Sequence, residues 1–263
     1  MNLNDLNVLK NRFSDYCRSF YFSDAEHQKN IALKEAHTHE VCKNIVLIAR
    51  EQRLSKNDIM LAETVALFHD VGRFSQYEKY KTFRDSISVN HGKLGAEILE
   101  QEEFIKNLSG DEQKIVVNSV KFHNAFGIPA LKNQKALLFL KLIRDADKLD
   151  IWRVFFEYYE SSGDEKASAT ALGLPDTPDY SKTVLSRIYK KQLISLTSLR
   201  TLNDFRLLQL SWIYDLNFRT SFRLLLERDY IRLISAKLPR TDEVGKITVL
   251  LKEFASQRLK NSR

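Results

Sequence analysis

The nine residues ALFHDVGRF, at positions 66–74, place a histidine and an aspartate side by side, His69 and Asp70, at the end of an apolar run. The run over residues 61–68 predicts a buried helix that leads into this pair. Adjacent side chains on a helix point about 100° apart, so both could reach one ion only if the helix ends there. We expect Gly72 to supply that ending as a C-terminal cap.

The other histidines and aspartates can be placed by the helical faces they share, because residues three, four and seven apart lie on one face. His39 falls on the face of Lys43 and Arg50, so we expect it to point outward. We expect the same of Asp145, which falls on the face of Lys141 and Lys148. Four others continue apolar stripes and are expected to point inward: His37, His91, His123 and Asp147.

Imidazole and carboxylate groups are costly to bury without a partner, and a metal ion is the simplest partner for this set. Histidine and carboxylate ligands suit iron, manganese, cobalt, nickel or zinc, and no thiolate narrows the choice. We expect one or two divalent ions per chain. His91 and His123 are either ligands of a second ion or hydrogen-bonding neighbours of a one-metal site.

Five sequence blocks carry a resemblance to a known family. They are His37-Thr38, residues 66–74, residues 90–99, Phe122-His123-Asn124 and residues 142–150. In this order, over roughly positions 35–153, they resemble the HD superfamily of metal-dependent phosphohydrolases. The resemblance implies an all-α HD-domain helical bundle, here with additional C-terminal helices. It places a metal on His37, His69, Asp70 and Asp147, and in two-metal members also on His91 and His123.

The resemblance implies hydrolysis of a phosphate ester or anhydride by a metal-bound hydroxide, and we expect the substrate to be a nucleotide. Asp70 is the expected catalytic residue and the natural bridge between two ions, because it has two oxygens. Arg73 is expected to serve catalysis and to bind the substrate phosphate, together with Lys148. Many relatives carry Lys in place of Arg73, and Arg is a poor proton donor, so we expect phosphate binding from it and not acid catalysis.

Three alternatives use the same sequence features. A mixed-valent di-iron HD oxygenase would have the same six ligands. A non-catalytic nucleotide-binding regulatory module would bind without turnover, although the intact ligand set argues against it. A nucleic-acid-binding protein would use the basic surface, but no nucleic-acid motif is visible and this partner is not expected.

Composition favours a helical enzyme with anionic partners. The 263 residues include 8 Gly and 4 Pro, so few residues interrupt helices. The net charge of +7 favours anionic partners but does not choose between a nucleotide, nucleic acid and a membrane surface. The expected partner, a phosphorylated small molecule, is what the resemblance implies. The two cysteines, Cys17 and Cys42, have no disulfide spacing and indicate a reducing compartment. We expect a cytoplasmic protein with no signal peptide and no membrane partner, and the oligomeric state stays open.

The chain is expected to form a single HD-type helical domain over residues 1–263, with a catalytic core at about 30–160 and peripheral helices at 1–22 and 180–263. Loops are expected at Ser161–Glu165 and Gly173–Pro178. The expected helices cover about 3–22, 30–53, 58–71, 90–107, 111–125, 134–161, 181–197, 202–235 with a break, and 241–260.

Overall fold

The computed structural model describes residues 1–161 and 173–261, and over these ranges the chain forms helices and no strands. This confirms the all-α prediction. The described residues divide into two compact units, each with its own core. The N-terminal unit contains Met1–Asp150, and the C-terminal unit contains Ile151–Glu160 and the described residues from Gly173 onward. That the two units fold as one domain stays a prediction.

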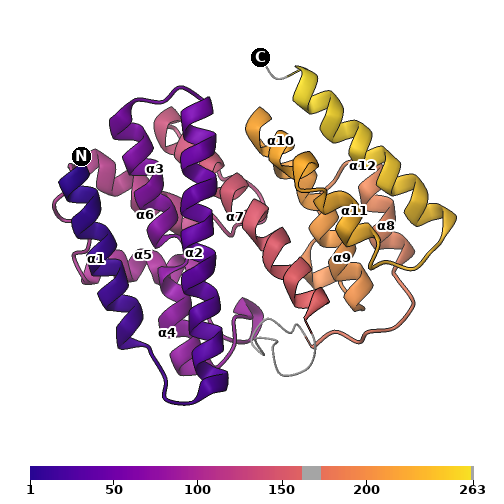
Figure 1. The fold of residues 1–263 in the computed structure, drawn as a ribbon, viewed down its shortest axis with the longest axis horizontal. Helices are drawn as coiled ribbons and strands as arrows, with labels where there is room; N and C mark the ends of the chain where they lie inside the picture. Colours follow the sequence, from indigo (N-terminus) through magenta and orange to yellow (C-terminus); the bar gives the residue numbers. More distant parts are fainter. Residues whose placement is uncertain (162–172, 262–263) are drawn as a thin grey trace. The chain divides into compact units, whose positions relative to one another are not determined.

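The N-terminal unit is built from seven α-helices, the last of which continues into the C-terminal unit (Figure 1). Side chains of Asp24, Ser55, Asn90 and Ser109 accept hydrogen bonds from backbone N–H groups at the starts of four of these helices, which fixes where they begin. The helices are α1 Leu3–Ser19, α2 Ala25–Glu51, α3 Lys56–Phe68, α4 Val71–Tyr80, α5 His91–Gln101, α6 Gly110–Phe122 and α7 Gln134–Glu160, with a 3-10 turn, η1, at Asp85–Ile87.

Helix α3 lies at the centre of the N-terminal unit. It packs against α1, α2 and α6, while α5 packs against both α4 and α6. Edge-to-face contacts join Phe13 of α1 to Phe68 of α3 and Phe74 of α4, and all three rings are buried. This aromatic core anchors α3 and α4 on either side of the His69-Asp70 pair.

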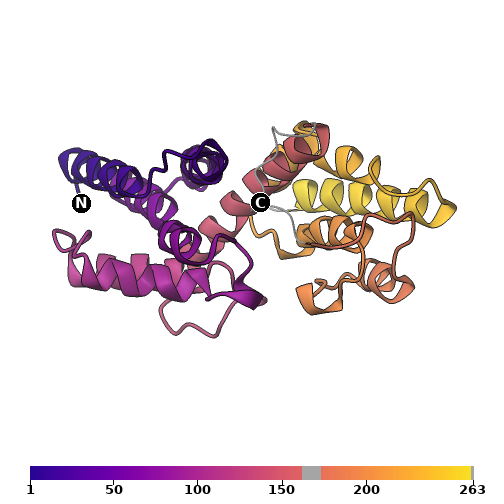
Figure 2. The same ribbon diagram turned by 90° about the horizontal axis from the view of Figure 1, so that it is seen from below.

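The C-terminal unit contains the end of α7 and five further α-helices (Figures 1 and 2). Trp152 of α7 donates its indole N–H to the Gln209 carbonyl of α9 at 3.0 Å. Helix α12 packs against α10 and α11. The helices are α8 Lys182–Tyr189, α9 Leu202–Ser211, α10 Arg219–Glu227, α11 Tyr230–Ser235 and α12 Asp242–Asn261, with 3-10 turns η4 at Leu196–Ser198 and η5 at Trp212–Asp215.

Most predicted helices are present, with shifted ends. Helix α8 is shorter than expected, and the predicted break in 202–235 is the turn η5 followed by separate helices α10 and α11. The expected loop at Gly173–Pro178 contains no helix. The loop expected at Ser161–Glu165 lies outside the described residues from Ser162 onward. No described helix is both long and apolar enough to cross a membrane.

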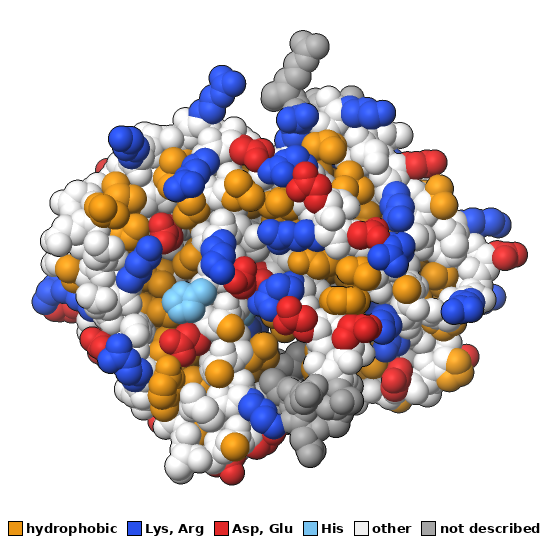
Figure 3. All heavy atoms as spheres, viewed as in Figure 1, with side chains coloured by type: hydrophobic (Ala, Val, Ile, Leu, Met, Phe, Trp, Pro, Cys, Tyr) orange, Lys and Arg blue, Asp and Glu red, His pale blue; other side chains and the backbone are white. Residues whose placement is uncertain are grey.

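Charged side chains are mixed in sign over the face shown in Figure 3, where Lys and Arg side chains alternate with Asp and Glu side chains. Ion pairs one helical turn apart on the protein surface include Lys43 with Glu40 and Arg223 with Glu227. Pairs of this kind add little stability.

The prediction that Gly72 caps the helix of His69 was wrong. Helix α3 ends at Phe68, His69 follows with a right-handed backbone, and Asp70 directly precedes α4, which contains Gly72. The break between α3 and α4 therefore ends the helix at the His69-Asp70 pair, which a Gly72 cap was expected to do. Gly72 has a different role: a Cβ there would collide with the His91 carbonyl oxygen and lie 2.8 Å from the Gly95 backbone nitrogen. The absence of a side chain lets α4 approach the start of α5.

We expect Gly72→Ala to destabilise the protein by about 1–3 kcal/mol, because the new methyl group meets backbone atoms that can yield only if α5 moves. Gly110→Ala is the matched control: a Cβ there meets nothing within 4 Å, so its free energy of unfolding should be unchanged or slightly raised. Urea unfolding measures both. Equal stability of the two variants would contradict the close approach of α4 and α5.

Candidate metal centre

Six predicted ligands come together inside the N-terminal unit, each from a different place in the helical framework. His37 lies within α2 and Asp147 within α7, whereas the other four lie at helix ends. His69 follows α3, Asp70 precedes α4, His91 is the first residue of α5 and His123 follows α6. All are buried except Asp147, whose side chain is 13% exposed.

Two groups of three residues have ligand atoms close enough to hold an ion. The first ligand group is His37, His69 and Asp70, and the second is Asp70, His91 and His123. Asp70 belongs to both because its two oxygens face opposite ways. Its Oδ2 lies 3.7 Å from Nε2 of His37 and of His69, and its Oδ1 lies 3.4 Å and 3.6 Å from Nε2 of His91 and of His123.

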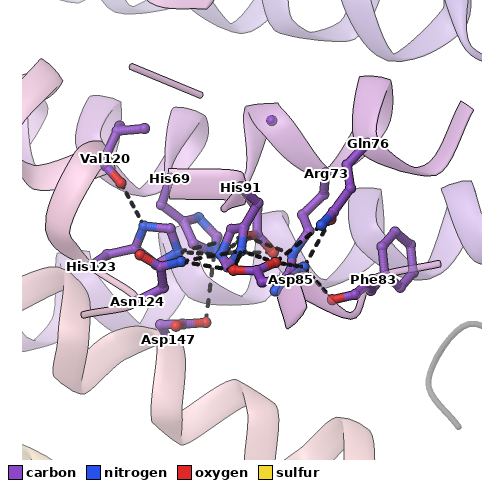
Figure 4. Close-up of polar contacts among 12 residues, drawn as sticks. His69, Arg73, Gln76, Phe83, Asp85, His91, Val120, His123, Asn124 and Asp147 are labelled. Atoms are coloured by element: carbon purple, nitrogen blue, oxygen red, sulfur yellow. Dashed lines mark hydrogen bonds and ion pairs between the residues drawn. The ribbon is translucent and has the colours of Figure 1, made fainter. Parts of the chain in front are cut away.

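Asp147 adjoins the first ligand group. Its Oδ1 lies 3.1 Å from Nε2 of His37 and 3.6 Å from Nε2 of His69. In Figure 4 its carboxylate faces the imidazoles from the α7 side. The first ligand group with Asp147 therefore offers two imidazoles and two carboxylates, and the second ligand group offers two imidazoles and one carboxylate.

The four imidazoles share one hydrogen-bonding pattern. Nδ1 of His69 lies 2.7 Å from the Ala66 carbonyl. Nδ1 of His123 lies 2.7 Å from the Val120 carbonyl (Figure 4). A carbonyl only accepts, so each Nδ1 carries the proton. Nδ1 of His37 similarly meets Asp150 at 2.6 Å, and Nδ1 of His91 meets Asp85 at 2.7 Å. In the neutral ring every Nε2 is then an acceptor.

The Nε2 atoms point at one another. They lie 3.3 Å apart between His37 and His69, and 3.1 Å apart between His91 and His123. Lone pairs that face each other at this distance need a shared cation, either a proton or a metal ion. Imidazole Nε2 with Nδ1 held by a carboxylate or carbonyl is also the usual arrangement of a histidine that ligates a metal. The donor set therefore fits a divalent ion in each ligand group.

The carboxylates of the cluster are held ionised. Burial opposes this, but Lys34 and His69 keep the pKa of Asp70 well below its usual value. Burial likewise opposes ionisation of Asp147, and hydrogen bonds from His37 and His69 lower its pKa well below the usual value. Both carboxylates are therefore charged, as a metal ligand must be.

The pKa of His37, in the first ligand group, and the pKa of His91, in the second, shift in opposite directions. Burial and Lys34 lower the pKa of His37, but hydrogen bonds to Asp147 and Asp150 outweigh them and raise it to about 9. Burial and Arg73 lower the pKa of His91 to about 3, despite its contact with Asp85. The first ligand group thus holds a proton near neutral pH that an ion must displace, whereas His91 is already neutral.

A polar network supports the second ligand group. Asp85 accepts hydrogen bonds from His91, from Nη1 of Arg73 at 2.9 Å, from Gln76 at 3.0 Å and from Asn124 at 3.1 Å (Figure 4). Burial raises the pKa of Asp85, but the contacts with His91 and Arg73 lower it by more, so the net shift is downward. The network fixes the orientation of the His91 ring.

Other predicted site residues lie as follows. His39 is exposed, as expected. Asp145 is fully buried, so the prediction that it points outward was wrong: the helical face that it shares with Lys148 is itself buried in α7. Lys148 is 8% exposed, and its Nζ donates to the Arg144 carbonyl at 3.2 Å. Its role in substrate binding stays a prediction.

Three residues near the cluster were given no role from sequence. Lys34 lies one turn before His37, and its Nζ is 2.8 Å from Oδ2 of Asp70. Asp150 lies one turn after Asp147 and holds His37. Asp85 holds His91 but lies in a turn, where no periodicity marks it. For the first two, the three-residue spacing from a ligand was the available signal.

The comparisons with known proteins identify the fold of this region. The family model described as "HD domain" matches residues 35–152. The matched region includes all six clustered residues and is consistent with the resemblance drawn from the motifs. Proteins with this domain are generally metal-dependent phosphohydrolases. Neither the curated proteins nor the solved structures yielded a match.

Metal binding should release protons in a pH-dependent way. Below about pH 9 the metal-free His37 carries a proton on Nε2, which a divalent ion must replace. Manganese binding near pH 7.5 should therefore release about one proton per chain, and affinity should rise with pH and level off above the pKa of His37. Calorimetry in buffers of different ionisation enthalpy measures this. Manganese binding at this pH without proton release would contradict the assigned proton.

Proposed function

We propose that the N-terminal unit is a metal-dependent phosphohydrolase that cleaves an ester or anhydride bond of a phosphorylated small molecule, such as a nucleotide. The observation that carries this proposal is the convergence of four imidazole Nε2 atoms on the two oxygens of Asp70. Two adjacent cation sites that share one carboxylate are suited to stabilising the attacking and leaving oxygens of a displacement at phosphorus.

The residues that would hold the ions are the first ligand group with Asp147, and the second ligand group. Iron, manganese, cobalt, nickel and zinc all accept such ligands. Divalent ions bound there would lower the pKa of a bound water from about 15.7 towards 7 and would polarise phosphoryl oxygens. The protein's own part is to keep Asp70 ionised, to fix each ring and to exclude bulk water from the buried side of the cluster.

Arg73 is suited to binding a phosphate next to the cluster. Its Nη1 is held by the Phe83 carbonyl at 2.5 Å and by Asp85, so the guanidinium group has one orientation. Its Nε is buried without a hydrogen-bond partner and lies 3.6 Å from Oδ1 of Asp70, too far for a good hydrogen bond. This free N–H would donate to a phosphoryl oxygen. Because Arg keeps its proton, it would orient and neutralise the phosphate and would not act as an acid.

A second candidate is oxygenase chemistry at a mixed-valent di-iron site. The donor set of imidazoles and carboxylates favours it no less, since iron accepts all six residues. The two candidates differ in what they need: phosphate hydrolysis should proceed with manganese, whereas an oxygenase requires iron and oxygen. Binding of a nucleotide without turnover is a further alternative. Phosphate release in a phosphatase assay would exclude it, and binding without phosphate release would support it.

The proposal predicts phosphate release from at least one member of a phosphorylated metabolite panel by protein loaded with manganese. Asp70→Asn should lower kcat/KM by at least about 100-fold, because the amide keeps the shape of the bridge and loses its charge. His39→Ala, which changes an exposed histidine on the same helix as His37, should retain full activity. Undiminished hydrolysis by folded Asp70→Asn would show that the chemistry lies elsewhere.

A further inference from the structure

Lys34 contacts the cluster directly, and the ligand set does not include it. Its Nζ is 2.8 Å from Oδ2 of Asp70, and its side chain is 16% exposed. It comes from α2, three residues before His37, so the two side chains share one face of the helix. Lys34 is therefore a partly exposed side chain that reaches a buried carboxylate.

The position of Lys34 conflicts with metal binding. Oδ2 of Asp70 is the same oxygen that faces His37 and His69, where an ion of the first ligand group would bind. A divalent ion and an ammonium group on one carboxylate oxygen would lie a few ångströms apart in a largely buried place, where like charges repel strongly. The ammonium group would have to move, and a flexible four-carbon stem permits this.

An aromatic ring and a second cation lie close to the ammonium group of Lys34. Nζ of Lys34 lies 5.2 Å from the centre of the Phe83 ring, and Cζ of Arg73 lies 5.8 Å from the same ring. Phe83 is partly exposed. Two cations, one from α2 and one from α4, thus flank one aromatic side chain beside Asp70. Between them they offer the free Nε of Arg73 and a mobile Nζ, which suits an anion with several oxygens.

We propose that Lys34 neutralises Asp70 in the metal-free protein and that metal ions release it to bind a phosphoryl oxygen of the substrate. This inference rests on the proposed function for its substrate class. It assigns different parts to the two cations. Arg73 is a rigid donor whose other nitrogen is held by the protein, and Lys34 is a mobile point charge whose position depends on metal occupancy.

The test uses the full chain with Lys34→Gln, Lys34→Arg and the control Lys43→Gln. Lys43 lies on the same helix, is exposed and pairs with Glu40, so its replacement makes the same charge change away from the cluster. Two quantities are measured by calorimetry at one pH: the affinity of the metal-free protein for manganese, and the affinity of the manganese-loaded protein for inorganic phosphate. Circular dichroism verifies that each variant is folded.

Lys34→Gln should bind manganese at least about threefold more tightly than wild type, because a competing cation is gone. The same variant should bind phosphate about 10-fold to 100-fold more weakly, because a charged hydrogen bond is lost. Lys34→Arg should recover part of the phosphate affinity, and Lys43→Gln should match wild type in both measurements.

Two results would overturn the proposal. Wild-type phosphate affinity in Lys34→Gln would show that Lys34 does not contact phosphate. Weaker manganese binding in that variant would show that Lys34 holds Asp70 in place for the ion and does not compete with it. These outcomes are separate from the proposed function, which fails if the wild-type protein hydrolyses no phosphorylated compound even though Lys34 governs phosphate binding.

Discussion

The N-terminal unit is organised around a buried carboxylate, that of Asp70, which has imidazole groups on both sides. Asp70 is 3% exposed, and each of its oxygens faces a different pair of imidazole nitrogens. Burying a charge in this way is costly unless cations surround it. The groups that surround the Asp70 carboxylate are the imidazole rings of four histidines, the ammonium group of Lys34 and the guanidinium group of Arg73. The packing of the helices brings these groups close together in space.

Helix ends supply most of the cluster, and this has a physical basis. His69 and His123 each directly follow a helix, and each ring turns back to the carbonyl three residues earlier. Carbonyls in the last turn of a helix lack the usual N–H partner four residues further on, so they can accept these N–H groups. The same contact satisfies the helix end and fixes the tautomer of the histidine. His37 and His91 lack such a carbonyl and use the carboxylates of Asp150 and Asp85 instead.

The sequence was informative where one long helix carries a residue among apolar neighbours. His37 and His39 were placed correctly because the stripes on α2 differ plainly in polarity. Asp145 was misplaced because Lys148, which shares its helical face, is charged but buried. The adjacent Arg144 is also buried and donates to the His123 carbonyl. Helix α4 was missed because its start depends on packing: Gly72 admits the His91 backbone. Neither tertiary contact leaves a periodic signal in the sequence.

The central proposal is that Asp70 would help to hold a divalent ion on each of its two sides, and counting ions tests it most directly. Elemental analysis of protein saturated with manganese, combined with anomalous diffraction from its crystals, gives both number and position. The account predicts two ions per chain, one on each side of Asp70, in wild type and in His39→Ala, and one ion in the double variant His91→Ala, His123→Ala. A single ion in wild type, or two ions that do not share Asp70, would contradict it.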